Sequence, residues 1–387
     1  MPEPASPRQP HDPAPTLPLM HATFILAGFG TMLLGPILPL LSQRWHLTDS
    51  QSGLMVLAQF CGATLGGLTV TAKLQRDMFL GLAAAAAGFF LFAFAPSLNL
   101  ACAALLAGGF GVGRVIATVN IIAGARYTRN RGSALSRLNF TWSFGALLSP
   151  LLAAWLIRLP LETRLAAFAA LFVGCAVALG AQIRRAPDTI AANRAVAEPA
   201  HPLPLKFFLY FAALLFIYGG LETCLSAWLT TYALRYGTTS LVLSEYTMVL
   251  LLCGLTAGRA LAAWLLLTMR DVTLQRIALI LAAGLAAALA LAHHAAVIAT
   301  LAVFLGVCLA PIFPATFALL MARRPSASQA GVVIAASGLG AAALPALMGV
   351  VSTRAGSLEI ALALPVAAAI AMFLLSLFPP ANAPQHT

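Results

Sequence analysis

One carboxylate of this sequence lies in the middle of a long apolar run. Glu222 is surrounded by mostly apolar residues over the range 205–235, and no other Asp or Glu lies as deep in such a run. A charged side chain inside a membrane-spanning segment is costly and usually serves a solute or ion path. We therefore expect Glu222 to bind a coupling cation or to accept hydrogen bonds from a polar solute. A structural ion pair that joins two halves of the protein is the alternative.

Three arginines also lie inside apolar runs. Arg114 shares a helical face with Thr118, one turn away, and is placed to contact a solute or to act as a counter-ion. Its alternative role is to reach the inner surface and bond helix-end carbonyls there. Arg137 and Arg259 lie nearer the inner ends of their runs. We assign both to a gate or to pairing at the inner surface.

Asn139 and Trp142 share one face of a predicted helix, at a spacing of three residues. This combination suits a sugar, because hydroxyls bind fixed polar groups while the apolar side of the ring stacks on an aromatic side chain. Packing between helices is the alternative role of Trp142. The other candidates for solute contact are Tyr218 and Ser226 on the face of Glu222, Trp228 about 120° around that helix, and the amides Gln59 and Asn120, which equally suit interhelical bonds.

The elements that must position these residues are membrane helices. The 387 residues are 61% hydrophobic and 9% charged, with a mean hydropathy of +0.92, whereas soluble domains are about 45–50% apolar and about 25% charged. A membrane helix needs about 20 mostly apolar residues. Twelve such segments are predicted, at 20–43, 51–73, 78–97, 98–125, 132–158, 163–183, 205–235, 241–268, 272–292, 296–322, 327–353 and 358–379.

The distribution of basic residues predicts the orientation. There are 22 Lys+Arg against 11 Asp+Glu, and with the N-terminus inside most of the basic residues fall in inner segments, as Arg126, Arg129 and Arg131 do. This bias predicts that both termini are cytoplasmic, in a bacterial-type inner membrane. The net charge of +11 is then explained by orientation rather than by a nucleic-acid partner. We expect a monomer embedded in the lipid bilayer.

The two halves of the chain resemble each other. The pattern Cys-Gly-x-Thr-x-Gly occurs at 61–66 and at 253–258, the pair Gly145/Pro150 matches Gly340/Pro345, and Gly111 matches Gly306. Because six helices is an even number, such repeats share one topology and are related by an axis along the membrane normal. We therefore predict an all-α fold of two parallel six-helix repeats around a central cavity. The predicted parts are a disordered tail 1–19, bundles 20–183 and 205–379, a cytoplasmic linker 184–204 and a tail 380–387.

Several stretches resemble the major facilitator superfamily, and within it the fucose permease-like sugar:proton symporters. They are 131–139 (RGSALSRLN), 144–150 (FGALLSP), 218–222 (YGGLE), 228–232 (WLTTY), 254–259 (GLTAGR) and 311–314 (PIFP). The resemblance implies a twelve-helix bundle whose central cavity opens alternately to each side, and proton- or sodium-coupled movement of a sugar-like solute. It also suggests that the Gly-Pro pairs Gly145/Pro150 and Gly340/Pro345 act as hinges in gating.

Three positions depart from the pattern of that family. Four residues before Asn120, where the family often carries an acid, this sequence has Ile116. The range 28–36 contains no carboxylate, and the loop 67–73 (GLTVTAK) lacks the Asp of the family's Gly-x-x-x-Asp-Arg motif. Glu222 is therefore left as the main candidate for coupling.

No pattern in the chain indicates an enzyme. The sequence contains neither HExxH nor GxSxG, and neither lysine belongs to a phosphate-binding loop. We expect no cofactor, no metal site and no catalytic residue. The prediction is a secondary active transporter for a small hydrophilic solute, most simply a sugar. The alternatives are transport of an organic anion or sugar acid through the in-span arginines, and multidrug efflux.

Overall fold

The computed structural model describes residues 15–47, 49–155, 158–185, 203–238 and 240–380. Most of the predicted tails and of the predicted linker 184–204 lies outside these ranges. Within them the chain is almost entirely helical, because long apolar segments in a bilayer must satisfy their backbone groups internally. The all-α membrane fold predicted from the sequence is confirmed.

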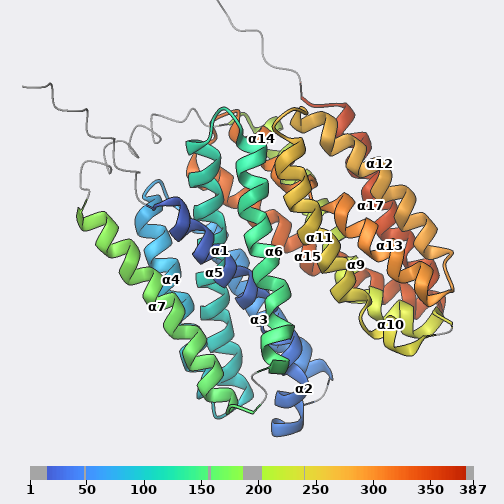
Figure 1. The fold of residues 1–387 in the computed structure, drawn as a ribbon, viewed down its shortest axis with the longest axis horizontal. Coiled ribbons are helices and arrows are strands. Elements are labelled where there is room, and N and C mark those ends of the chain that lie inside the picture. Colours follow the sequence, from blue (N-terminus) through green and yellow to red (C-terminus); the bar gives the residue numbers. More distant parts are fainter. Residues whose placement is uncertain (1–14, 48, 156–157, 186–202, 239, 381–387) are drawn as a thin grey trace, which may run out of the picture.

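The N-terminal half forms six helical passes, the first of them broken after Met32. Its helices are α1 (Leu17–Met32), α2 (Leu34–Trp45), α3 (Asp49–Leu68), α4 (Leu74–Ala93), α5 (Leu98–Arg126), α6 (Arg131–Trp155) and α7 (Leu161–Arg185). Each agrees with a predicted span to within a few residues. The early break makes α1 and α2 one pass in two pieces (Figure 1).

The C-terminal half forms six further passes, three of which are interrupted. Its helices are α9 (Leu205–Tyr236), α10 (Leu241–Glu245), α11 (Thr247–Leu265), α12 (Asp271–Ala290), α13 (Ala295–Leu309), α14 (Ile312–Met321), α15 (Ala327–Ala355), α16 (Leu358–Ala361) and α17 (Ala363–Leu377). In the described part of the chain, nine helical segments are long and apolar enough to cross a membrane. The shorter apolar helices Leu17–Met32 and Leu54–Leu68 add to them.

Both halves use glycine to bring the same pairs of helices into backbone contact. A Cβ atom at Gly28 of α1 would lie 1.9 Å from the carbonyl oxygen of Trp142 on α6. In the second half, a Cβ atom at Gly219 of α9 would lie 2.0 Å from the carbonyl oxygen of Ser337 on α15. Close approach of this kind is how membrane helices pack through small residues. The matching contacts agree with the two-repeat architecture.

One of the three sequence matches between the halves was wrong. A Cβ atom at Gly306 would lie 2.2 Å from the carbonyl oxygen of Leu251 on α11, whereas Gly111 faces α4. The residue of α5 in the corresponding position is Gly109, whose Cβ atom would lie 2.0 Å from the carbonyl oxygen of Gln59 on α3. The stretch 108–113 is rich in glycine, so the sequence alone could not select the glycine on the correct face.

The two halves touch at the end of the bundle where both described chain ends lie (Figure 1). There the hydroxyl of Ser133 on α6 donates to the carbonyl oxygen of Ala263 on α11, at 2.6 Å. On the other side of the molecule, a Cβ atom at Gly67 of α3 would lie 3.3 Å from Cβ of Ala335 on α15. Toward the opposite end the halves diverge, and α2 and α10 lie apart (Figure 1). The space between the halves is therefore closed at the end that carries the termini.

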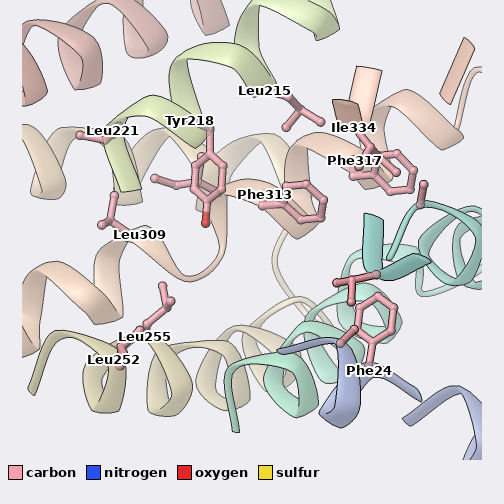
Figure 2. Packing of buried hydrophobic residues seen from close by; sticks show 14 of the residues in the cluster. Phe24, Leu215, Tyr218, Leu221, Leu252, Leu255, Leu309, Phe313, Phe317 and Ile334 are labelled. Atoms are coloured by element: carbon pink, nitrogen blue, oxygen red, sulfur yellow. The ribbon is translucent and has the colours of Figure 1, made fainter. Parts of the chain in front are cut away.

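Buried aromatic side chains fill the C-terminal half next to this space. The ring centroids of Tyr218 and Phe313 are 5.9 Å apart, and Phe317 stacks on Phe313 at 5.9 Å with nearly parallel planes. Figure 2 shows Tyr218 and Phe313 side by side, with the Tyr218 hydroxyl directed away from its own helix. This packing fixes the position of α9 relative to α14.

Candidate functional site

A cavity of about 210 Å³ lies between the two halves. Its wall takes side chains from α1, α3, α5 and α6 of the first half and from α9, α11, α14 and α15 of the second. Pockets for drug-sized ligands measure about 300–1,000 Å³, so this cavity suits a smaller solute. Of the candidates predicted from the sequence, its lining includes Asn139, Trp142, Tyr218, Glu222, Ser226 and Arg259.

The charged centre of the cavity is the pair Glu222 and Arg259. The Glu222 carboxylate on α9 lies 3.6 Å from the Arg259 guanidinium on α11, and the exposed fractions of the two side chains are 19% and 3%. A buried guanidinium is costly unless a counter-charge lies beside it, and Glu222 supplies that charge. Arg259, which the sequence assigned to a gate or to pairing at the inner surface, also forms part of the cavity wall.

Arg259 links the two halves as well. Its guanidinium donates to the Ser143 hydroxyl and, at 3.3 Å, to the Asn139 carbonyl oxygen, both on α6. Its carbonyl oxygen accepts a hydrogen bond from Ser136 at 2.8 Å, and its guanidinium carbon lies 5.2 Å from the ring centre of Trp142. One residue of α11 thus joins the carboxylate of α9 to helix α6 of the other half.

Polar groups of two aromatic residues border the cavity without a protein hydrogen bond. The indole nitrogen of Trp142 and the hydroxyl of Tyr218 are buried and have no partner that meets hydrogen-bond geometry among the described residues. The Tyr218 hydroxyl nevertheless lies close to Glu222 and Arg259. Buried polar groups are normally paired, so these two are suitable donors for a bound solute.

Asn120 supports the cavity from behind rather than lining it. Its side-chain nitrogen donates to the Ile116 carbonyl oxygen at 3.0 Å, and its oxygen accepts from Asn139 at 3.4 Å. Asn139 also donates to the Leu135 carbonyl oxygen at 2.8 Å. Asn139 reaches the cavity, and Asn120 holds its orientation. Ile116, which stands where the resembling family often has an acid, lies in the cavity wall.

Two other candidates bond to neighbouring helices outside the cavity lining. The Gln59 amide nitrogen donates to the carbonyl oxygens of Gly30 and Thr31 at 2.9 and 3.1 Å, which ties α3 to α1. The Trp228 indole donates to the Pro345 carbonyl oxygen at 3.1 Å, which ties α9 to α15. In this geometry both side chains form interhelical bonds. For Gln59, the sequence had left open the choice between such a bond and contact with a solute.

Arg114 lies outside the cavity lining, where the sequence had placed a solute contact. Its guanidinium binds the Asp77 carboxylate of α4 at 2.6 Å and the Thr69 hydroxyl at 2.7 Å. Asp77 also accepts from the Thr71 amide at 2.6 Å. The charge of Arg114 is paired with a buried carboxylate and the residue is absent from the cavity lining, so this geometry does not provide the expected solute contact. Sequence reasoning missed Asp77, which follows the loop 67–73 that lacks the usual Asp and stands in the first turn of α4.

The residues assigned to gating, apart from Arg259, are two glycines, two prolines and Arg137. Gly145 and Gly340 lie at helix crossings, where Cβ atoms would be 2.0 Å from the Ile25 and 1.8 Å from the Phe216 carbonyl oxygens. Pro150 and Pro345 lie within the continuous helices α6 and α15. Arg137 is exposed outside the central cavity and donates to the Ser133 hydroxyl at 3.1 Å. Their role in gating stays a prediction.

The cavity also contains residues that were not predicted to contact a solute. They are small polar or aromatic side chains, namely Thr31, Phe60, Thr64, Thr223, Phe313 and Ser337. Such residues are common in membrane helices, and only the assembled bundle distinguishes those that face the cavity.

The chain is similar to known transporters. Its residues 20–332 match the model of the Major Facilitator Superfamily, and no curated protein sequence matches it. The E. coli fucose:proton symporter FucP is 17% identical, with 94% of this chain and 98% of FucP covered and a TM-score of 0.71. The human organic anion transporter MFSD10 is 18% identical, with 93% and 98% covered and a TM-score of 0.76.

A third solved structure, that of the proton:xylose symporter XylE, is 14% identical, with 94% of each chain covered and a TM-score of 0.69. FucP in the outward conformation gives a TM-score of 0.72. At these identities the structures establish the fold, and the sequence model establishes the family over most of the chain. The chain therefore belongs to the major facilitator superfamily and is a membrane transporter rather than an enzyme.

Proposed function

We propose that the chain carries a small polar solute, with a neutral sugar as the leading class, by alternating access coupled to a proton or sodium gradient. The observation that carries this proposal is the ion pair of Glu222 and Arg259 in the wall of a small cavity. Because the two charges offset each other, the remaining polar groups of this largely apolar cavity are an amide, several hydroxyls and the indole of Trp142. Those groups suit a neutral sugar.

Glu222 is the proposed coupling residue because its charge acts on Arg259. As a carboxylate it attracts the guanidinium that also binds Ser143 on the other half. A proton or sodium ion at Glu222 offsets that charge, so Arg259 then depends on its bonds to α6. Cation binding is thereby linked to the contacts that hold the halves together, as coupling between two conformations requires.

Two structural neighbours support the sugar class. FucP is described as a fucose:proton symporter and XylE as a proton:xylose symporter. The hydroxyl and amide groups around Trp142 would provide the same kind of recognition here. The cavity volume of about 210 Å³ disfavours bulky drugs, which removes the main support for multidrug efflux.

Uptake into proteoliposomes tests the coupling role. We expect Glu222→Gln to abolish solute accumulation driven by a proton or sodium gradient while exchange of labelled for unlabelled solute continues, because exchange needs no net cation movement. The matched control is Glu245→Gln, which removes an exposed carboxylate of the same half and leaves both activities unchanged. Gradient-driven accumulation by Glu222→Gln at the wild-type level would contradict the proposal.

An organic anion such as a sugar acid is the second candidate. The observation in its favour is Arg259, which replaces Arg114 as the cationic group of the cavity, and MFSD10 is described as an organic anion transporter. When Glu222 is neutralised, Arg259 becomes available to a carboxylate. If this candidate is correct, Arg259→Gln will weaken binding of a sugar acid far more than binding of its neutral parent. Equal losses favour the neutral sugar.

We also propose that the closed end of the bundle faces the cytoplasm, with the chain in a bacterial-type inner membrane as a monomer. The basic residues near this end support that orientation. We further propose that the chain divides into bundles 20–183 and 205–379, which the glycine contacts repeated in each half support. Accessibility of a tag at the C-terminus to protease in intact and opened cells would test the orientation.

A further inference from the structure

A second cavity lies at the closed end, within the N-terminal half. It has a volume of about 330 Å³ and is bordered by the start of α1, the end of α5 and the start of α6. Its lining includes His21, Arg126, Arg129 and Arg137, which we call the basic pocket. No carboxylate is among the described residues that line it. Arginines from the end of α5, the following loop and the first part of α6 thus converge, beside His21 of α1, on one hollow that is separate from the cavity at Glu222.

Two arginines of this pocket are available to a ligand. Arg129 and Arg137 are exposed and form no ion pair within the described chain. Arg137 donates one hydrogen bond to the Ser133 hydroxyl at 3.1 Å, which orients the guanidinium and leaves other N–H groups free to bind a ligand. Arg126 is held at the pocket wall by a bond of 2.8 Å to the Pro15 carbonyl oxygen.

The start of α6 adds favourable backbone N–H groups, which act against the C-terminus of α5 at the same pocket. Asn130 lines the pocket directly before Arg131, the first residue of the 25-residue helix α6. The first N–H groups of a helix and its dipole favour an anion at that position. His21 and Tyr127 supply further polar groups at the rim. Arginine forks and helix N-termini together are a common arrangement for phosphate.

We propose that the basic pocket binds a phosphate-bearing anion, either the headgroup of an anionic lipid or a free phosphate. The pocket opens at the end of the bundle where helices leave the apolar region, a depth that lipid headgroups reach. Through Arg137 and Ser133 it is connected to the contact of Ser133 with Ala263 on the other half. An anion bound there stabilises the closed end of the transporter.

Thermal unfolding of the purified full-length protein in neutral detergent tests the site, with two probes. One probe is phosphatidylglycerol, compared with phosphatidylcholine, and the other is inorganic phosphate, compared with chloride at equal ionic strength. We expect phosphatidylglycerol or phosphate to raise the Tm in a saturable way. The double variant Arg129→Gln/Arg137→Gln should weaken the apparent affinity about tenfold or more, at about 1 kcal/mol for each basic group near the lipid surface.

The matched control is Arg323→Gln, which removes a basic residue at the same end of the molecule from a different cavity. It should keep the wild-type response. A response to phosphatidylglycerol alone identifies a lipid headgroup, and a response to inorganic phosphate as well identifies the phosphate group itself. The proposal is overturned if neither probe raises the Tm, or if the double variant and wild type respond equally. These experiments measure the Tm and not transport. A negative result would therefore overturn the anion site without bearing on the proposed transport function.

Discussion

At the scale of single residues, the buried arginines occupy two environments that the sequence could not distinguish. Arg114 is paired with Asp77 and bonded to Thr69 outside the cavity lining. Arg259 faces a more loosely placed carboxylate at 3.6 Å and borders the cavity. A buried ion pair is costly to break by removing one partner, because the other charge remains unpaired. The first arginine therefore belongs to the stability of the fold and the second to the site.

The first prediction concerns Asp77. Asp77→Asn should destabilise the purified protein by about 3–5 kcal/mol because it leaves Arg114 buried without its counter-charge. The double variant Asp77→Asn/Arg114→Gln should recover part of that loss. Thermal unfolding of the protein in detergent measures both effects.

The control for Asp77 is Glu162→Gln, which removes the partner of Arg44 in a pair whose side chains are 31% and 55% exposed. Because exposed pairs contribute little, this change should have an effect below about 1 kcal/mol. If Arg114 instead bound the solute, Arg114→Gln would weaken solute binding in the folded protein, and our assignment would be wrong.

At the scale of helices, glycine decides which pairs approach closely. Contact through Gly28 brings α1 against α6, and contact through Gly219 brings α9 against α15. Trp142 lies on α6 and Glu222 lies on α9, so each contact includes one helix that carries a residue of the cavity. The same close contact in each half therefore helps to position the two sides of the cavity.

The second prediction concerns these crossings. Gly28→Ala and Gly219→Ala should each destabilise the protein by about 1–3 kcal/mol, because the added methyl group meets a carbonyl oxygen that must shift. The controls are Gly174→Ala and Gly284→Ala, whose added Cβ atoms have no atom within 4 Å. Thermal unfolding compares the four variants. Equal stability of crossing and control variants would show that the helices do not approach as closely as described.

At the scale of the whole molecule, the two halves meet at one end and diverge at the other (Figure 1). Access to the cavity from the closed end requires that contacts such as Ser133 to Ala263 separate. Transport by alternating access then depends on breaking these contacts and re-forming others at the opposite end.

The third prediction locks the closed end. A Cβ atom at Gly331 would lie 2.6 Å from the carbonyl oxygen of Gly67 and 3.1 Å from Cβ of Val70. The backbones must therefore move slightly apart, which brings the two Cβ atoms toward the spacing of about 3.5–4.5 Å found in disulfides. With the six native cysteines replaced, Val70→Cys/Gly331→Cys should form a disulfide under oxidation. We expect the oxidised protein to lose transport and to retain solute binding, because neither residue lines the cavity.

Reduction should restore transport by the locked variant, and the two single-cysteine variants should be insensitive to oxidant. Proteoliposome uptake and a binding assay measure the two properties separately. Undiminished transport by the fully cross-linked protein would contradict movement of the halves at this end.

The sequence by itself determined the membrane fold. Twelve apolar segments, their lengths and the repeated Cys-Gly-x-Thr-x-Gly pattern were sufficient, because a bilayer admits few ways of satisfying the backbone. It also singled out Glu222, because a single carboxylate deep in an apolar run is conspicuous. The structure places Glu222 in the cavity lining, and its role in coupling stays a prediction. Helical periodicity correctly grouped Tyr218 with Glu222 and Asn139 with Trp142, as residues on one face of one helix stay together in any packing.

The tertiary structure decided which helices face one another. Arg259 meets Glu222, and Arg114 meets Asp77, although both arginines look alike in the sequence. The pairing depends on the rotation of α5 and α11 about their own axes, which is fixed by glycine contacts with α3 and α13. The same rotation places Gly109 rather than Gly111 opposite Gln59. Periodicity defines the faces of a helix, and only packing against its neighbours determines what each face contacts.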